Sequence, residues 1–147
     1  MQTFSLNAEE LIPILQEQLQ SGGAARLGVT GTSMMPLLRN GKDSVLLCPA
    51  DAPKKGDILL YRRKNGHYVL HRVVGLGETT LLCCGDNQWA KEPVLPEQAL
   101  AKVCAYYRGD KKHPVSGFCY WCYVNHLPLR RLCLRLISWL YKCKNLP

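Results

Sequence analysis

Residues 57–76, DILLYRRKNGHYVLHRVVGL, carry the clearest fold signal in the chain. Two runs rich in β-branched and large apolar residues flank the Asn-Gly dipeptide at 65–66, which favours a two-residue type I′ turn. This turn predicts an antiparallel hairpin in which Leu60 lies opposite His71. Because side chains alternate along a strand, His71 shares an apolar face with Val73. We therefore expect a β-hairpin with one histidine on its apolar face.

Further short β-type runs, separated by turn residues, lie on both sides of this hairpin. We expect strands at residues 26–30, 44–48, 57–62, 68–76, 80–84 and 100–107. This spacing is typical of a compact antiparallel or mixed β-domain rather than of a parallel sheet with crossover helices.

Helical periodicity is confined to the two ends of the chain. Residues 5–20 place Leu11, Ile14, Leu15 and Leu19 at helical spacing, with Ser5 or Asn7 as the cap. Residues 127–144 form a second amphipathic pattern, with leucines on one side and arginines on another. The sequence thus predicts a mainly β protein with an N-terminal amphipathic helix and a C-terminal basic amphipathic helix. Its three parts are residues 1–23, 24–108 and 109–147.

Composition supports a folded protein whose excess charge is local. Of 147 residues 47% are apolar, which argues against disorder, and the net charge is +8. Basic and acidic residues nearly cancel up to Cys104, whereas Asp110 is the only acid after Tyr106. The excess positive charge therefore belongs to the C-terminal segment.

The sequence also predicts the cellular compartment. The N-terminal segment contains Glu9, Glu10 and Glu17 and so does not form an apolar signal core. Residues 127–141 are the most apolar stretch, but three arginines interrupt it, so we expect no transmembrane span. We expect a cytoplasmic protein, peripheral to the membrane at most, whose eight cysteines are mostly reduced.

The residues most suggestive of chemistry form the segment Gly-Thr-Ser-Met-Met-Pro at 31–36. A serine becomes a nucleophile when a base removes its proton and donors stabilise the oxyanion. The alternative interpretation of the segment is a Gly-Thr-Ser turn followed by a methionine plug.

Two further segments extend this pattern: Lys-Gly-Asp-Ile at 55–58 with Leu-His-Arg-Val-Val at 70–74, and Gly-Asp-Asn at 85–87. In order and spacing, the three segments resemble the S24/S26 superfamily of serine peptidases, which contains signal peptidases and self-cleaving repressors. The resemblance covers residues 28–103. It lies nearest to the endoplasmic-reticulum type of signal peptidase, although this chain does not begin with the transmembrane helix of the membrane-bound relatives.

The resemblance implies a role for three residues. Ser33 is the expected nucleophile, His71 the expected general base, and Asp86 the expected carboxylate that orients His71. The alternatives are a core histidine bonded to a backbone carbonyl and a turn-forming aspartate before Asn87.

The resemblance also implies an oxyanion hole and a substrate groove around Gly31, Thr32, Met34, Met35 and Pro36. Many relatives carry a serine hydroxyl at the position of Gly31, so the Ser33 N–H is the expected oxyanion donor here. Substrates of the family bind as an added strand, with small residues next to the scissile bond.

Cys119-Tyr-Trp-Cys122 has the spacing of a redox pair or half a zinc site. No second pair is present, so we interpret these cysteines as small apolar residues and expect neither a metal nor an organic cofactor.

The basic C-terminal helix has three interpretations: folding back on the domain, lying on an anionic membrane surface, or docking a partner. Nucleic acid is not expected, because no binding motif accompanies the charge. We expect a serine endopeptidase that cleaves a leader or signal-like peptide. The alternative is a non-catalytic peptide-binding or membrane-docking module.

Overall fold

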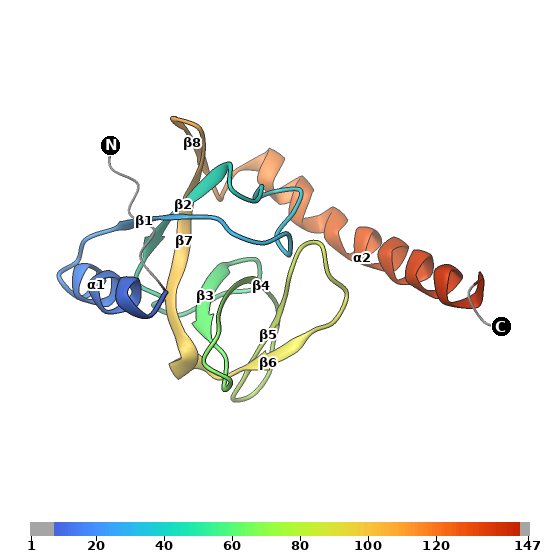
Figure 1. Cartoon of the computed structure of the whole chain (residues 1–147), viewed down its shortest axis with the longest axis horizontal. Coiled ribbons are helices and arrows are strands. Elements are labelled where there is room, and N and C mark those ends of the chain that lie inside the picture. Colours follow the sequence, from blue (N-terminus) through green and yellow to red (C-terminus); the bar gives the residue numbers. More distant parts are fainter. Residues whose placement is uncertain (1–7, 145–147) are drawn as a thin grey trace.

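The computed structural model describes residues 8–144 and contains one antiparallel sheet between two helices (Figure 1). The sheet has the order β1-β2-β7-β3-β4-β5-β6, and β8 also pairs with β7. Its strands are β1 (Ala25–Gly28), β2 (Asp43–Cys48), β3 (Ile58–Arg62), β4 (Tyr68–Leu76), β5 (Leu81–Cys84), β6 (Glu92–Val94), β7 (Ala99–Arg108) and β8 (Lys111–Pro114). A short 3-10 turn, Pro96–Gln98, precedes β7. The mainly β architecture with a helix at each end is confirmed.

Two of these strands were not predicted from the sequence. β6 contains Pro93, which cannot donate to a sheet ladder, and β8 is the polar stretch Lys-Lys-His-Pro. Both strands have only one partner, and proline and charged residues are typical of such edges. Because β8 pairs with β7, the sheet continues beyond Arg108, where the sequence predicted the domain to end.

The register of the β3–β4 hairpin differs from the prediction by one residue. His71 pairs with Leu59 rather than with Leu60. The cause is the turn: the Gly66 N–H donates to the Arg63 carbonyl, and the Gly66 φ of 88° is left-handed. This is a three-residue turn in which glycine takes the left-handed position, not a two-residue type I′ turn. The alternation that puts His71 and Val73 on one face is unaffected.

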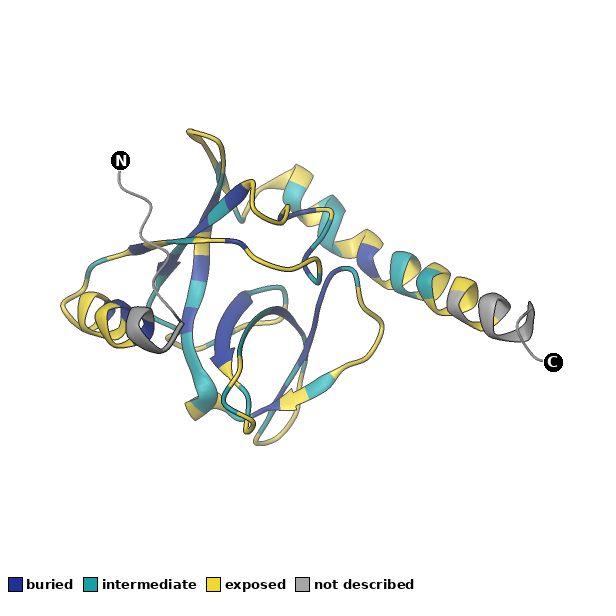
Figure 2. Ribbon diagram, viewed as in Figure 1, coloured by how far each residue is buried: buried dark blue, intermediate teal, exposed yellow. Residues whose placement is uncertain are grey.

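The apolar residues form two buried clusters, one on each face of the central strands. Figure 2 shows buried residues along the strands of the sheet. In the larger cluster, α1 (Ala8–Gln20) contributes Ile12, Leu15 and Leu19. The predicted caps of this helix, Ser5 and Asn7, lie outside the described residues. The smaller cluster contains Leu59, Tyr61, Val73, Leu81, Cys83 and Val94. His71 is 3% exposed and pairs with Leu59, so it belongs to the face of the smaller cluster.

The C-terminal helix α2 (Phe118–Lys144) begins well before the predicted Leu127 and contains Pro128 in its interior. Its first half packs against the β-domain, and its second half extends away from the sheet (Figure 1). The prediction began at Leu127 because the alternation of leucines and arginines begins there. Among the described residues, no helix has the length and apolar character needed to cross a membrane.

Candidate functional site

Ser33 lies on the turn between β1 and β2, which Gly31 opens. The Gly31 φ of 81° is left-handed, a conformation that glycine adopts without steric cost, and its N–H donates to Asn40 Oδ1 at 3.0 Å. Gly31 and Thr32 are exposed and Ser33 is half-buried. In the described part of the chain, no backbone hydrogen bond uses the Ser33 N–H. That group is therefore available as a donor to an oxyanion.

The methionine after Ser33 does not line a groove as predicted. Met34, Leu37 and Leu38 are all buried in the larger cluster. Their i, i+3, i+4 spacing puts them on one side of a single helical turn, in which the Leu38 N–H donates to the Met34 carbonyl at 3.0 Å. Met34 is a core residue that anchors the Ser33 turn.

The structure brings the Ser33 turn into contact with Gly85-Asp86-Asn87. The Asn87 N–H donates to the Ser33 carbonyl at 2.8 Å. A Cβ on Gly85 would lie 2.6 Å from the Ser33 oxygen and 3.1 Å from the Ser33 Cβ. Glycine is required at 85 because the backbone of the Ser33 turn occupies the space of a side chain.

His71 meets a carboxylate, but that carboxylate belongs to Glu92 on β6. Its Nδ1 lies 3.0 Å from Glu92 Oε1 and 3.0 Å from the Tyr61 hydroxyl oxygen. The Tyr61 hydroxyl donates its proton to the same carboxylate oxygen. Because an ionised carboxylate only accepts, the proton between His71 and Glu92 must be on Nδ1. In neutral His71, Nε2 is then the unprotonated nitrogen.

Gly85 follows the strand that lies beside the strand of His71. β4 and β5 pair Val73 with Cys83 and Arg72 with Cys84. The ladder ends there, so His71 and Gly85 are the next residues along the two strands but are not paired. Among the described residues, no hydrogen bond joins Ser33 to His71, and Nε2 of His71 has no partner. Such bonds are often long in the absence of substrate.

The electrostatics keep His71 neutral and Glu92 charged. Burial lowers the pKa of His71 below its ordinary value, although the nearby Glu92 acts in the opposite direction. Burial alone would raise the pKa of Glu92, but hydrogen bonds from Arg63 and Tyr61 outweigh it and lower that pKa. Arg63 donates from Nη2 to Glu92 Oε1 at 2.7 Å. A neutral imidazole beside a fixed carboxylate is suited to accept a proton.

Asp86 does not orient His71, in contrast to the prediction. It accepts two hydrogen bonds from Arg72, each of 2.8 Å, and one of 2.9 Å from the Tyr123 hydroxyl. His71 and Arg72 are consecutive on β4, so their side chains point to opposite faces of the sheet. The buried Arg72 side chain binds Asp86 on one face of the sheet, and His71 contacts Glu92 on the other face.

The Arg72–Asp86 ion pair also attaches α2 to the sheet. Arg72 Nη1 donates to the Tyr120 hydroxyl at 2.5 Å and to the Gly56 carbonyl at 2.7 Å. Arg130 donates to Asn87 Oδ1 at 3.0 Å, and an Arg131 nitrogen lies 3.8 Å from Asp86. The loop that touches Ser33 is thus held by residues of β4 and α2. We call Arg72, Asp86, Tyr120 and Tyr123 the ion-pair cluster.

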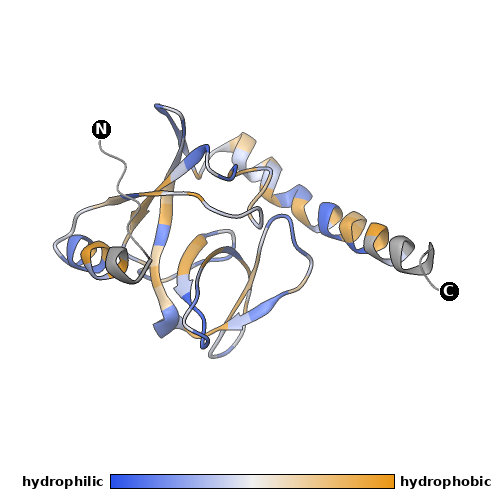
Figure 3. Ribbon diagram, in the orientation of Figure 1, coloured by the Kyte–Doolittle hydropathy of each residue, from blue (hydrophilic) through white to orange (hydrophobic). Residues whose placement is uncertain are grey.

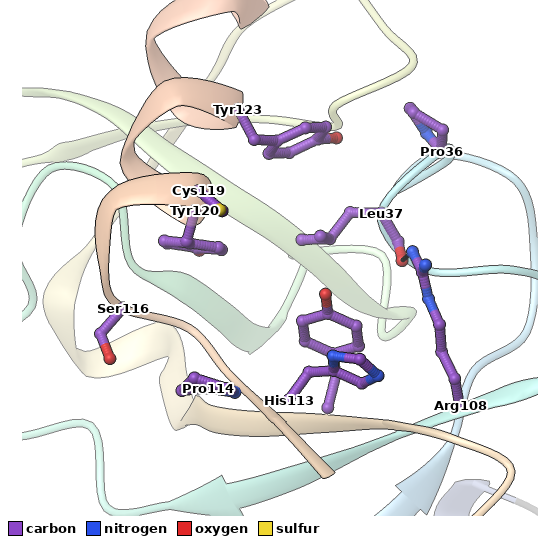
Figure 4. Close-up of a pocket in the computed structure, with 10 residues that line it drawn as sticks. Pro36, Leu37, Arg108, His113, Pro114, Ser116, Cys119, Tyr120 and Tyr123 are labelled. Carbon is purple, nitrogen blue, oxygen red and sulfur yellow. Dashed lines mark hydrogen bonds between the residues drawn. The ribbon is translucent and has the colours of Figure 1, made fainter. Parts of the chain in front are cut away.

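A cavity of about 360 Å³ lies between the Ser33 turn, the β7–β8 hairpin and the start of α2 (Figure 4). Pro36 and Leu37 line it on the side of the turn, and Tyr120 and Tyr123 line it on the side of the helix. Across the cavity, His113 stacks on Tyr106 with ring centroids 5.0 Å apart. Pro36 is exposed and Met35 half-buried, so these two predicted groove residues remain accessible.

The cysteines of the Cys-x-x-Cys segment lie on the first turns of α2. Cys119 is exposed and Cys122 half-buried, so they do not pack as core residues as the sequence suggested. Both are free, and Cys119 also lines the cavity. Within residues 8–144, no group of three or more His, Cys, Asp or Glu side chains is placed to hold a metal ion.

Glu92 is the functional candidate that sequence reasoning did not assign. The only available signal was that it is the first acid after Gly-Asp-Asn, and its place beside Pro93 gave no indication of a strand. A comparison of the chain with protein-family models, curated proteins and solved structures found no match.

Proposed function

We propose that the protein is a serine endopeptidase in which Ser33 is the nucleophile, His71 the general base and Glu92 the group that orients His71. The single observation that supports this most is the bond from His71 Nδ1 to the Glu92 carboxylate. It leaves Nε2 as the basic nitrogen of a residue on β4, and the neighbouring strand β5 leads into the Gly85 loop that contacts Ser33. A serine, a histidine and a carboxylate that act in this order constitute the catalytic logic of acyl transfer.

The reaction begins when His71 Nε2 accepts the Ser33 hydroxyl proton as the oxygen attacks a peptide carbonyl. The Ser33 N–H stabilises the resulting oxyanion, and Glu92 stabilises the imidazolium. His71 then protonates the leaving amine, which gives an ester on Ser33. Water, deprotonated by His71, hydrolyses this ester and restores the serine. Every proton removed by His71 is returned, so the cycle needs no external acid.

The substrate is an extended peptide or protein segment with small residues at the scissile bond, as the resemblance to the S24/S26 superfamily implies. Such a segment adds to the sheet as a strand near Thr32 and Met35. The cavity beside Pro36 is large enough to take one substrate side chain. Processing of a leader or signal-like peptide inside the cell is the role that fits these features.

A non-catalytic peptide-binding module on the same fold is the second candidate. Two observations favour it: no hydrogen bond joins Ser33 to His71 among the described residues, and Gly31 stands where many relatives have a serine hydroxyl. A binding module would retain peptide affinity when Ser33 is replaced and would generate no new peptide termini.

Mass spectrometry of peptide N-termini separates the two candidates. Cells would express the wild type, Ser33→Ala, His71→Ala or Glu92→Gln, with Ser21→Ala and His67→Ala as exposed controls of the same residue types. The peptidase predicts new N-termini with the wild type and both controls, none with Ser33→Ala, and few with the other two variants. Identical termini from all folded variants would contradict peptidase activity.

A further inference from the structure

The outward face of α2 carries a row of exposed apolar side chains. Exposed fractions range from 52% to 77% for Phe118, Trp121, Leu129, Leu132, Leu136 and Trp139. In Figure 3 this helix alternates between hydrophobic and hydrophilic residues along its length. Scattered exposed leucines are common on soluble domains, but six large apolar side chains gathered on one face of a helix, with only Asn125 among them, are typical of a contact surface. We call these six residues the outer stripe.

The outer stripe lies opposite the face that holds the domain. At 3.6 residues per turn, its six members fall within an arc of about 80°. Tyr120, Tyr123 and Leu127 fall on the other side of the helix, where the two tyrosines bond to the ion-pair cluster and Leu127 is buried. Since the domain is attached to one side of α2, the outer stripe is free to contact something else.

The charge of the C-terminal segment indicates which kind of partner the outer stripe contacts. After Cys104 the chain has eight basic residues and one acid, Asp110. Arg130 and Arg131 face Asn87 and Asp86, so they hold the helix on the domain. Of the exposed basic residues after Cys104 that the structure describes, Arg135 lies on α2 about 40° from the edge of the outer stripe, and Arg108, Lys111 and Lys112 lie on the β7–β8 hairpin. The sequence adds Lys142 and Lys144.

These charges do not fit a second copy of the helix. Helices that pair through an apolar seam usually match opposite charges along its flanks. Here the segment 111–147 contains no acid at all, so two copies would bring like charges together. An apolar helix face with aromatic residues at both ends, in a segment that is rich in basic residues and contains no acid, instead has the composition of helices that lie in the surface of an anionic bilayer.

We propose that α2 binds the surface of an anionic lipid bilayer through the outer stripe. The leucines enter the boundary between headgroups and acyl chains, Phe118, Trp121 and Trp139 lie at headgroup depth, and the exposed basic residues meet lipid phosphates. The inner face of α2 keeps the β-domain attached through Tyr120 and Tyr123. This association is independent of peptidase activity.

Vesicle co-sedimentation of the full chain tests the proposal. The probes are vesicles of phosphatidylcholine alone and of equal parts phosphatidylcholine and phosphatidylglycerol, at about 0.1 M and 1 M salt. We expect binding to the phosphatidylglycerol vesicles at the lower salt, and weaker binding both at the higher salt and to phosphatidylcholine. Wild-type protein that stays in the supernatant with phosphatidylglycerol at the lower salt would overturn the proposal.

Leu136→Glu and Ile137→Glu form a matched pair of variants. Both positions are 52% exposed, but Ile137 lies about 100° around the helix from Leu136 and outside the outer stripe. We expect Leu136→Glu to weaken vesicle affinity at least about tenfold, and Ile137→Glu to weaken it several-fold less. Equal losses from the two variants, at unchanged circular dichroism, would contradict the role of the stripe. So would a lipid-free dimer, measured by light scattering, that Leu136→Glu dissociates, because a second copy would then cover the stripe.

Discussion

Glu92 Oε1 lies 3.0 Å from His71 Nδ1, and these two residues come from β6 and β4, which are not adjacent in the sheet. β5 separates the two strands, so Glu92 reaches His71 across one strand. Tyr61 on β3 and Arg63, which directly follows β3, donate to the same carboxylate from the other side. The carboxylate is thereby fixed before any substrate arrives, which is the condition for it to stabilise an imidazolium without reorganisation.

Replacement of Glu92 by Gln should remove the fixed charge and leave the shape nearly unchanged. We expect the rate of peptide cleavage to fall roughly 10²- to 10⁴-fold, because His71 loses both its preferred tautomer and the charge that stabilises its protonated form. Nitrogen NMR of the His71 ring should show the Nδ1 proton in the wild type and a mixed tautomer in the variant. Glu97→Gln, at an exposed position nearby, is the control. An unchanged tautomer in Glu92→Gln would refute the assignment independently of any substrate.

The depressed pKa of His71 predicts a pH dependence of stability. The folded state binds the His71 proton less readily than the unfolded chain, whose imidazole titrates near 6.5. At high pH both states are neutral at this residue. As the pH falls from 6.5 toward the folded-state pKa, the unfolded chain takes up the proton first, so the His71 contribution to stability is lost. Urea denaturation between about pH 5 and 7 should show a shallower pH slope for His71→Gln than for the wild type. Equal slopes would mean that His71 is not buried in its neutral form.

The lowered pKa of His71 also predicts how the peptidase activity falls as the pH becomes acidic. Only neutral His71 can accept the Ser33 proton, so kcat/KM should decline below a midpoint that lies under 6.5. Glu92→Gln should move this midpoint to lower pH, because Glu92 raises the pKa of His71. A cleavage assay on any identified substrate measures both midpoints, and a midpoint that rises in Glu92→Gln would contradict the assigned contact.

The sequence predicted the architecture well because strand alternation and turn residues are local signals. All six predicted strands exist, and β4 has the predicted bounds. The errors came from effects that are not local. Whether Asn65-Gly66 forms a two-residue or a three-residue turn depends on how β3 and β4 pack, and that choice shifts His71 from Leu60 to Leu59. α2 begins early because Tyr120 and Tyr123 meet a buried ion pair that no helical pattern reveals.

The sequence predicted the motifs of the site but not the contacts that their side chains make. The Ser33 turn contacts Gly-Asp-Asn at 85–87, and this loop follows β5, the strand that pairs with β4 and so lies beside the strand of His71. The partner of His71 could not be predicted, because Asp86 and Glu92 are chemically equivalent candidates and the choice depends on which face each strand presents. The buried Arg72 decides it, since a guanidinium with 1% of its side chain exposed must find a carboxylate on its own face.

Asp86→Asn should therefore destabilise the fold rather than alter the chemistry of His71 directly. Removal of one partner from the buried Arg72–Asp86 pair leaves an uncompensated guanidinium and should cost about 3–5 kcal/mol of unfolding free energy. Urea titration measures this loss, and Asp110→Asn, at an exposed turn, should change stability by less than about 0.5 kcal/mol. A cost for Asp86→Asn as small as that of the control would show that Arg72 finds another partner, and that Asp86 is free for another role.

Gly85→Ala tests the contact between Ser33 and the Gly-Asp-Asn loop most directly. The added methyl group would meet the Ser33 carbonyl at 2.6 Å and the Ser33 Cβ at 3.1 Å, so either the loop or the Ser33 turn must move. Overpacking of this kind costs roughly 1–3 kcal/mol. Gly28→Ala is the matched control: a Cβ at Gly28 meets no atom within 4 Å, and the residue lies in β1. There the substitution should be neutral or slightly stabilising, because alanine restricts the unfolded chain. If Gly85→Ala were as stable as Gly28→Ala and equally active, the Ser33 turn would not rest on Gly85, and the proposed proximity of Ser33 and His71 would lose its main support.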